Sequence, residues 1–301
     1  MPGVFHRKRQ SVGIGKMIAC GAAAAGGLML ERSHYDMHRF VTGCYRVSSD
    51  KIMRDLRIVL LADLHDNVFG RHNKALLDAI DALKPDLVLC AGDMTTAHKD
   101  PSRQRGEEAC ALLMTLGCRY PTLVINGNHE TRIDERRHLY GDRYDTYEAS
   151  VHSAGAVILR NERVIFPEMG VAVTGLELPL DYFGHFGLKK LSLDDIKGMI
   201  GAPDSNYYNI LIAHHPDYFP KYAEWGADLS VAGHVHGGIV WLPGIGGLVS
   251  PRYLPFPRYT GGMYSKNGSS MVVSRGLGMH TIPLRIFNPC ELVFIEIKAE
   301  G

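Results

Sequence analysis

Cysteine is scarce in this sequence, and the few cysteines show no pattern. Six are present among 301 residues, with no CxxC pair and no regular spacing. Such spacing is typical of a disulfide framework or a zinc knuckle, so neither is expected. Cys90 lies within an apolar run and is interpreted as a small core residue.

A surplus of charge of either sign is also missing. Thirty-three Lys and Arg residues face 32 Asp and Glu residues, which leaves a formal net charge of +1. Because nucleic-acid-binding domains usually carry a basic surplus, no nucleic acid partner is expected. A glycine-rich phosphate loop and a Ser or Cys nucleophile paired with a base are lacking too. The candidate functional residues that remain are the acidic residues and the fifteen histidines.

The N-terminus combines a basic stretch with a weakly apolar one. The sequence HRKR at 6–9 precedes MIACGAAAAGGLML at 17–30. The length of the apolar stretch 17–30 suits the core of a signal peptide. Residues 11–30 together are just long enough to cross a bilayer, which takes about 20 residues. No clear cleavage site follows, and no twin-arginine signal is matched. We expect membrane association through an N-terminal signal-anchor; the alternatives are a cleaved signal and a helix of a cytoplasmic protein.

Apolar runs alternate with helical patterns in the first half of the chain. Strands are predicted over 56–66, 86–93 and 122–129, and helices over 73–83 and 107–117. This alternation is typical of a parallel sheet covered by helices. The later apolar runs are shorter and less often separated by helices, which favours a second, mixed or antiparallel sheet. Two sheets packed face to face with helices outside would use residues 51–301 as one domain, after an N-terminal segment 1–50 whose part from Glu31 to about Lys51 is a connector.

Five of the predicted strands end in His, Asp or Asn. In α/β sheets the carboxyl ends of the strands form the ligand crevice, so these side chains, distant in sequence, should converge in space. Each one alone also fits a structural role as a cap, a turn or a buried imidazole. The residues are Asp63, His65, Asp93, Asn128, His129, His214, His215, His234 and His236.

This set of side chains indicates a metal site of nitrogen and oxygen ligands. Without thiolates, Asp, His and Asn suit divalent first-row metals, and seven donors are too many for one tetrahedral ion. Two ions sharing a carboxylate fit the number. Two aspartates leave such a site positive, so it attracts an anionic phosphoester, and the ions lower the pKa of bound water to generate a hydroxide nucleophile. Phosphoester hydrolysis is the reaction that fits.

The motifs ADLH, AGD, GNHE, AHHP and GHVHGG, in this order, resemble the calcineurin-like metallophosphoesterases. The resemblance covers residues 56–298. The ending VSRGLGMHTIPLRIFNPCELVFIEI at 273–297 is similar to a bacterial branch with an N-terminal signal or anchor, related to enzymes that cleave the diphosphate of UDP-2,3-diacylglucosamine. The resemblance implies a four-layered αββα sandwich of two mixed β-sheets flanked by helices, with residues 51–301 as the metallophosphoesterase domain.

The resemblance also implies a role for each site residue. Asp63, His65 and His236 would bind the first metal, and Asn128, His214 and His234 the second. Asp93 would bridge two divalent ions of Mn, Fe or Zn. His129 would stand beside the metals as a phosphate contact or general acid.

Two positions depart from the family pattern. Glu130 replaces the more frequent Asp, and we expect it to orient a neighbouring ligand from behind. In AHHP two histidines compete; spacing to Pro216 favours His214 as the ligand, with His215 as the alternative.

The substrate is less constrained by the sequence. An arginine-rich stretch at 131–148 could be a helix or flap near the site, and an aromatic loop at 241–259 could form a cap in which Arg252 or Arg258 clamps a phosphate. A solvated face and an ordinary connector are the simpler interpretations. We predict a phosphodiesterase or pyrophosphatase acting on a phosphorylated small molecule or a lipid- or nucleotide-linked substrate, with no protein partner. The alternatives are a phosphomonoesterase, including a protein phosphatase, and a catalytically inactive binding scaffold.

Overall fold

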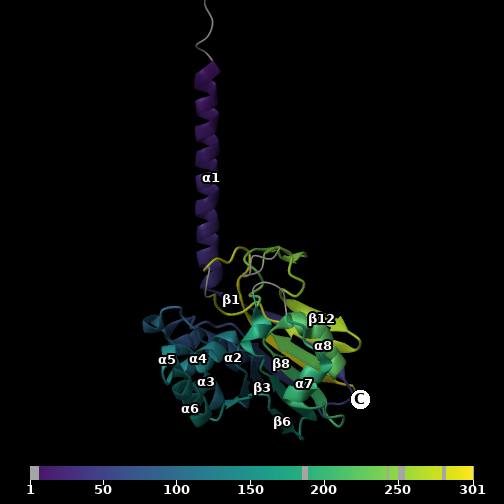
Figure 1. Cartoon of the computed structure of the whole chain (residues 1–301). Helices are drawn as coiled ribbons and strands as arrows, with labels where there is room; N and C mark the ends of the chain where they lie inside the picture. The colour runs from purple at the N-terminus through teal and green to yellow at the C-terminus, as the bar shows by residue number, and fades with distance from the viewer. Residues whose placement is uncertain (1–6, 185–188, 243, 250–254, 280–282, 301) are drawn as a thin grey trace, which may run out of the picture.

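Two six-stranded sheets pack face to face, with helices on both outer faces (Figure 1). This arrangement comes from a computed structural model that describes residues 7–184, 189–242, 244–249, 255–279 and 283–300. The first sheet has the order β1-β14-β2-β3-β4-β5, and the second has the order β12-β13-β9-β8-β7-β6. The predicted fold class, two mixed sheets flanked by helices, is therefore confirmed.

The first sheet has a parallel centre formed by the alternating half of the chain. Strands β2 to β5 run parallel, β14 pairs antiparallel with β2, and β1 pairs parallel with β14. The strands are β1 Phe40–Ser49, β2 Leu56–Leu61, β3 Leu87–Cys90, β4 Thr122–Val124, β5 Val157–Ile158 and β14 Cys290–Ala299. The helices that accompany them are α2 Lys74–Leu83, α3 Glu107–Gly117, α4 Asn128–Glu135, α5 Arg137–Tyr140 and α6 Arg143–Ser153.

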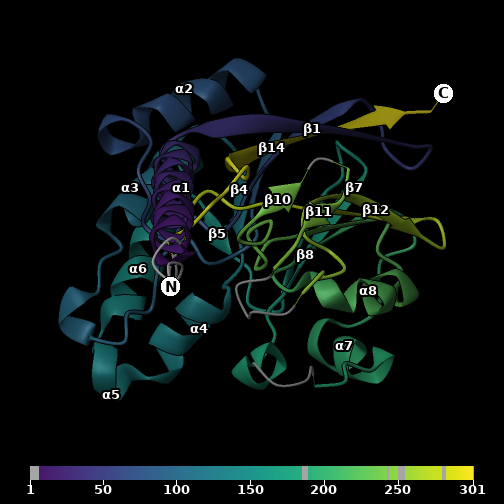
Figure 2. The ribbon, with the colours of Figure 1, turned by 90° about the horizontal axis from the view of Figure 1, so that it is seen from above.

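The second sheet is mixed, as the shorter runs predicted. Strands β7, β8, β9 and β13 are parallel, and β6 and β12 close the two edges as antiparallel strands. The strands are β6 Arg163–Phe166, β7 Val171–Leu176, β8 Tyr208–Ala213, β9 Leu229–Ala232, β12 Gly262–Lys266 and β13 Ser269–Val273. Helices α7 Leu193–Ile200 and α8 Phe219–Trp225 cover its outer face, and a small hairpin joins β10 Trp241–Leu242 to β11 Gly246–Gly247 (Figure 2).

Three apolar layers hold the four layers of elements together. One lies between the helices α2, α3 and α6 and the first sheet, the second between the sheets, and the third between the second sheet and α7 and α8. The strands of the middle layer are buried on both faces, as in β7 and β8, where every residue is buried. Removing one of these large aliphatic side chains would cost about 2–5 kcal/mol of folding free energy. The tightly packed layer between the sheets therefore fixes the positions of the strand ends.

The N-terminal segment differs from the expected anchor and connector. Helix α1, Arg7–Met37, projects from the body (Figure 1), and the chain then enters β1, which pairs with β14 over ten residues. The connector expected between Glu31 and Lys51 is therefore wrong for 40–49, which form an edge strand of the first sheet. A weak apolar pattern hides this strand, because its partner lies about 250 positions away. Among the described residues, no helix has the length and hydropathy that crossing a membrane requires.

Candidate metal centre

The predicted site residues follow the carboxyl ends of five strands. Strands β2, β3 and β4 of the first sheet lead into Asp63 and His65, Asp93, and Asn128 and His129, and β8 and β9 of the second lead into the remaining histidines. Because the two sheets face each other, these ends meet in one place. The side chains are buried, apart from half-buried His234. The nine positions are Asp63, His65, Asp93, Asn128, His129, His214, His215, His234 and His236.

Five of these residues have a left-handed backbone. Asp63, His65 and Asp93 have φ angles of 51°, 50° and 53°, and His234 and His236 have 71° and 54°. Residues other than glycine adopt this region at a cost of about 1–3 kcal/mol each, and such strain gathers at functional sites. The bends turn the side chains from the strand ends toward one common point.

Glycine at position 92 lets the loops approach closely. Gly92 has a φ of 87°, and a Cβ atom there would lie 2.5 Å from the backbone nitrogen of Gly127 and 3.0 Å from Nδ1 of His214. A side chain at this position would push apart the loops that follow β3, β4 and β8. The AGD motif therefore has a structural requirement for its glycine in addition to its acid.

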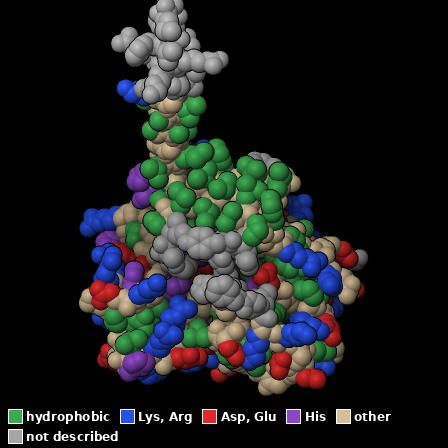
Figure 3. All heavy atoms as spheres, turned by 45° about the horizontal axis from the view of Figure 1, so that its top comes forward, with side chains coloured by type: hydrophobic (Ala, Val, Ile, Leu, Met, Phe, Trp, Pro, Cys, Tyr) green, Lys and Arg blue, Asp and Glu red, His purple; other side chains and the backbone are tan. Residues whose placement is uncertain are grey.

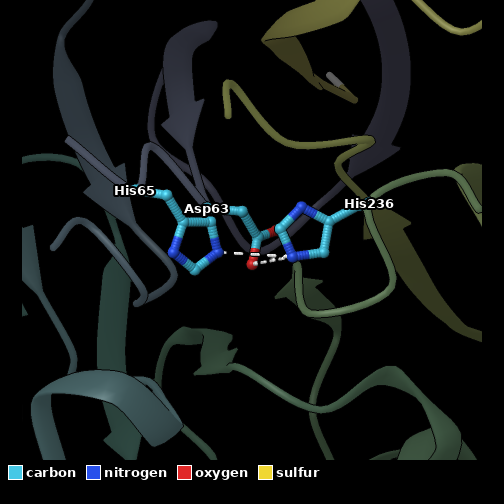
Figure 4. A group of neighbouring side chains, drawn as sticks. All are labelled: Asp63, His65 and His236. Atoms are coloured by element: carbon cyan, nitrogen blue, oxygen red, sulfur yellow. Dashed lines mark hydrogen bonds and ion pairs between the residues drawn. The ribbon is translucent and has the colours of Figure 1, made fainter. Parts of the chain in front are cut away.

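Three overlapping groups of acids and histidines have the spacing of metal ligands. They are Asp63, His65 and His236; His65, Asp93 and His129; and Asp93, His214 and His234, and in each the ligand atoms lie within 4.8 Å of one another. Figure 4 shows the first group, in which Nε2 of His236 lies 3.3 Å from Nε2 of His65 and 3.7 Å from a carboxylate oxygen of Asp63.

Asp93 belongs to two of the three groups. Its Oδ2 atom lies 3.1 Å from Nε2 of His214, 3.9 Å from Nε2 of His65 and 4.0 Å from Nε2 of His129. Its other oxygen accepts a hydrogen bond from the backbone nitrogen of His129 at 2.8 Å. One carboxylate oxygen thus faces imidazoles from three strand ends.

The hydrogen bonds that three histidines make through Nδ1 turn their Nε2 atoms toward the centre. Nδ1 of His214 donates to the carbonyl oxygen of Ala91 at 2.6 Å, and Nδ1 of His236 donates to that of Gly278 at 3.0 Å. Nδ1 of His65 lies 3.1 Å from the hydroxyl of Thr96, which can accept its proton. In a neutral imidazole with its proton on Nδ1, Nε2 carries the lone pair. All three Nε2 atoms face the centre; that of His214 lies 3.1 Å from a carboxylate oxygen of Asp93, so its proton must leave before a metal binds there.

His129 has the opposite arrangement. Its Nδ1 accepts a hydrogen bond from the backbone nitrogen of Ala97 at 2.9 Å, so this atom carries no proton. The proton of the neutral ring must then be on Nε2, the atom that faces Asp93. His129 therefore presents a donor to the centre, although its distance alone would also permit ligation.

Asn128 contributes an oxygen that has no partner. Its Oδ1 atom is buried and accepts no hydrogen bond from any described residue. A buried polar atom without a partner costs about 1–3 kcal/mol, and at functional sites such an atom frequently serves a ligand or ion. An amide oxygen next to this set of imidazoles and carboxylates fits a divalent ion.

The two central aspartates have pKa values shifted in opposite directions. Burial, helped by the charge of Asp93, raises the pKa of Asp63 to about 7. Burial also opposes ionisation of Asp93, but the imidazoles of His214 and His129 and a hydrogen bond from His214 hold its pKa well below the usual range. Burial lowers the pKa of His214, but Asp93 more than compensates and raises it to about 9. In the metal-free protein, protons on Asp63 and His214 balance the negative charge of this cluster, and a bound cation would take the place of these protons.

His215 is not part of the centre. Its Nδ1 accepts a hydrogen bond from the backbone nitrogen of Asp217 at 3.3 Å, and its carbonyl oxygen accepts one from the hydroxyl of Tyr222 at 2.7 Å. It belongs to none of the three groups with ligand spacing. Of the two competing histidines, His214 is therefore the one that the fold brings to the centre.

Glu130 supports the loops behind the centre. One carboxylate oxygen accepts hydrogen bonds from the backbone nitrogens of Asp93 and Gly127 at 2.9 and 3.0 Å, and the other accepts one from Thr95 at 2.9 Å. The carboxylate therefore links the turn after β3 to the start of α4. This contact agrees with the supporting position expected for Glu130.

Asn288 is a supporting residue that the sequence did not reveal. Its side-chain amide donates to the carbonyl oxygens of His236 and Gly238, both at 2.7 Å, and its backbone nitrogen donates to the carboxylate of Asp36 at 3.1 Å. Asn288 and Asp36 are fully buried. The last turn of α1 is thereby joined to the loop of His236. A polar pair within RIFNP and ERSHYD was the available signal, but its partners are some 250 positions apart.

A basic cavity opens beside the centre. It has a volume of about 530 Å³, and its lining includes His65, His98, Arg103 and Arg105 together with one acid, Asp66. The arginine-rich stretch at 131–148 lies in α4 to α6 on the outer side of the first sheet, with Tyr140, Tyr144 and Tyr147 buried, and α4 begins with the site residues Asn128 and His129, as one of the two expectations had it. Of the two arginines expected in a cap, Arg258 is exposed and lies over the ring of Tyr259, and Arg252 lies outside the described residues.

The sequence of this chain is similar to those of known phosphoesterases. Residues 56–238 match the family model of the calcineurin-like phosphoesterases. A metallophosphoesterase of Bacillus subtilis, YkuE, is 27% identical over 98% of both chains, and the phosphodiesterase YaeI of Escherichia coli is 27% identical over 74% of this chain and 75% of its own. The solved structure of TT1561 from Thermus thermophilus covers 74% of this chain and 90% of its own, at 12% identity and a TM-score of 0.44.

Proposed function

This chain belongs to the calcineurin-like phosphoesterase family and is a hydrolase of phosphoesters, and from this premise we propose that it cleaves a phosphodiester or diphosphate with two divalent metal ions. The observation that supports the proposal best is the position of Asp93, whose Oδ2 atom lies within 4.0 Å of imidazoles from three strand ends. A carboxylate in this position suits a bridge between two ions.

The donors divide into two sets around that carboxylate. In the proposal, Asp63, His65 and His236 hold one ion, Asn128, His214 and His234 hold the other, and Asp93 contributes to both. Imidazole nitrogens and carboxylate oxygens without thiolates suit Mn, Fe or Zn. When bound, two such ions would activate water and neutralise charge on the phosphoryl oxygens.

His129 acts on the substrate in this proposal and does not bind metal. The hydrogen bond from Ala97 keeps its Nδ1 unprotonated, so Nε2–H points at the centre as a donor. That N–H can donate a hydrogen bond to a phosphoryl oxygen or to the leaving oxygen and so stabilise the negative charge that develops there, which contributes about 100-fold or more to the rate. The backbone bond from His129 to Asp93 keeps the donor in register with the shared carboxylate.

A diester or diphosphate is favoured over a monoester by one feature beside the centre. The cavity next to His65 is lined by Arg103, Arg105 and His98, so a second anionic group of the substrate would meet basic side chains there. The relative from Escherichia coli carries the name phosphodiesterase. We extend the proposal to lipid- or nucleotide-linked substrates, including the class of diphosphates related to UDP-2,3-diacylglucosamine, and to membrane association through the N-terminal segment.

The test compares two nitrophenyl phosphates on the full chain. With added Mn²⁺, bis-p-nitrophenyl phosphate should be hydrolysed at least tenfold faster than p-nitrophenyl phosphate at equal concentration. EDTA should abolish the reaction, and restored Mn²⁺ should recover it. Faster hydrolysis of p-nitrophenyl phosphate, the monoester, would favour a phosphomonoesterase. No hydrolysis of either ester by metal-loaded protein would favour an inactive scaffold.

A further inference from the structure

Large apolar side chains are exposed together at the base of α1. Ile245, Phe256 and Phe287 are 68%, 72% and 50% exposed, and Tyr35 on α1 is 54% exposed. We call these four residues the apolar platform. In Figure 3 hydrophobic side chains gather around the base of α1, whereas charged side chains dominate the lower part of the body. A soluble surface rarely concentrates large apolar groups in this way without a partner.

The platform is built on a set of backbone hydrogen bonds. The nitrogen of Trp241 donates to the carbonyl oxygen of Ile286 at 3.0 Å, and that of Phe256 donates to Leu248 at 2.8 Å. Ser33 of α1 accepts a bond from the nitrogen of Arg285 at 2.9 Å. The segments that carry Ile245, Phe256 and Phe287 are therefore linked to each other and to α1, where Figure 3 shows exposed hydrophobic side chains.

Two of the platform residues combine a strained backbone with an exposed aromatic ring. Phe256 and Phe287 have φ angles of 49° and 55°, in the left-handed region that bulky side chains rarely occupy. Each also exposes an aromatic ring to water. Glycine or asparagine would meet the backbone requirement without exposing a ring. Strain and exposure combined on the same two residues indicate that the rings have a partner.

We infer that the apolar platform rests on a lipid bilayer that contains anionic head groups. The guanidinium of Arg32 lies 5.0 Å from the ring centre of Phe287, and that of Arg39 lies 4.3 Å from the ring of Tyr35. Arginines beside exposed aromatic rings are typical of the boundary between lipid tails and phosphates.

The charge of the N-terminus points to the same partner. The first 30 residues contain Arg7, Lys8, Arg9 and Lys16 and no Asp or Glu. On α1, which leaves the body at the platform, Leu28 and Leu30 are 67% and 66% exposed. Where such a helix lies against a membrane, each basic residue on it strengthens binding to anionic lipid by about 1 kcal/mol. A basic and apolar surface of this kind matches anionic lipid better than it matches a neutral protein face.

Docking at the platform would also orient the metal centre. Asn288, next to Phe287, donates to the carbonyl oxygen of His236, so the platform and the centre share one end of the fold. A phosphoester whose apolar part stays in the bilayer would then meet the centre from the lipid side. This consequence for the substrate rests on the proposed function, whereas docking itself does not.

Tryptophan fluorescence tests the contact directly on the full chain. Phe256→Trp places a reporter on the platform, and Ile165→Trp places a matched reporter on β6, at the end of the body away from α1 (Figure 1), where Ile165 is 41% exposed. Vesicles contain phosphatidylcholine and phosphatidylglycerol with brominated acyl chains, which quench tryptophans in contact with them.

We expect vesicles to quench the added emission of Phe256→Trp at least twofold and that of Ile165→Trp not at all. Equal quenching at both positions, or none at Phe256→Trp while the protein sediments with the vesicles, would overturn the inference, because α1 alone would then explain binding. Ile245→Glu with Phe287→Glu should weaken binding to vesicles at least fivefold, and Ile165→Glu should not; unchanged binding of the double variant would contradict the platform. Neither the quenching measurement nor the vesicle-binding measurement depends on hydrolysis. Both therefore test docking at the platform even if the proposed function is wrong.

Discussion

The carboxylate of Glu130 accepts a hydrogen bond from the backbone nitrogen of Asp93 at 2.9 Å. It accepts two further backbone bonds, from Gly127 and Thr95, and so keeps the turn of Asp93 against the start of α4. Asp93 holds its left-handed backbone, at a φ of 53°, within this arrangement. Glu130, the residue next to His129, thus positions Asp93 from behind.

We predict that Glu130→Ala lowers metal affinity by roughly 10–100-fold, the usual effect of removing a group that orients a ligand. Metal content after dialysis against a buffered Mn²⁺ series is the measurement. Glu130→Gln keeps one oxygen acceptor and should be milder, because burial and the charge of Asp93 already raise the pKa of Glu130 to about 8. If both variants bind metal as tightly as the wild type, the support assigned to Glu130 is wrong.

The neighbours His129 and Asn128 should separate catalysis from metal binding. His129→Asn should keep about the wild-type metal content and lower the rate by roughly 100-fold, the contribution of a positioned hydrogen-bond donor. The loss should be greater for esters with poor leaving groups, since nitrophenolate is already a stable anion and gains little from a hydrogen bond. Asn128→Ala should lose metal together with activity. Emptying of a metal site by His129→Asn, with Asn128→Ala unaffected, would reverse the two assignments.

Metal uptake by the metal-free protein should weaken as the pH falls. The pKa of His214 is raised to about 9, so at neutral pH an incoming ion must displace its proton. The pKa of Asp63 is raised to about 7, so a second proton competes below that pH. Affinity should therefore rise from pH 6 to pH 9. Calorimetric titration with Zn²⁺ in buffers of different ionisation enthalpy measures the protons released, and an affinity that does not change with pH would contradict this prediction.

The edge strand β1 should be required for stability. A chain that starts at Lys51 lacks the ten residues that pair with β14 and leaves that strand exposed at its edge. We predict a fall in Tm of roughly 5 °C or more, since each 1 kcal/mol shifts Tm by about 2–4 °C for a domain of this size. A chain that starts at Arg39 keeps β1 and is the matched control, because it lacks only α1. Equal Tm values for the two chains would show that β1 is dispensable.

The sequence predicts those parts of the fold that local patterns encode. The helix predicted over 107–117 is α3 with the same bounds, and the polar strand ends identify the nine residues that the structure places at or beside the centre. Strand β1 escapes prediction because its residues become a strand only by pairing with β14. The bond from Asn288 to the loop of His236 escapes for the same reason.

The protonation of the histidines could not be predicted either. Motif spacing treats His129 and His214 alike, as imidazoles beside Asp93. Their difference arises from the backbone groups of Ala97 and Ala91, which donate to one ring and accept from the other. These partners lie 32 and 123 positions away, and only the fold brings them into contact.

The central claim is a two-ion centre that shares Asp93, and metal content measures it most directly. The apo protein, reconstituted with excess Mn²⁺ and freed of unbound metal, should hold two ions per chain by elemental analysis. Asp93→Asn should hold fewer than one, because it weakens both sites, whereas His129→Asn should still hold two. One ion per chain in the wild type, or two in Asp93→Asn, would contradict the shared centre.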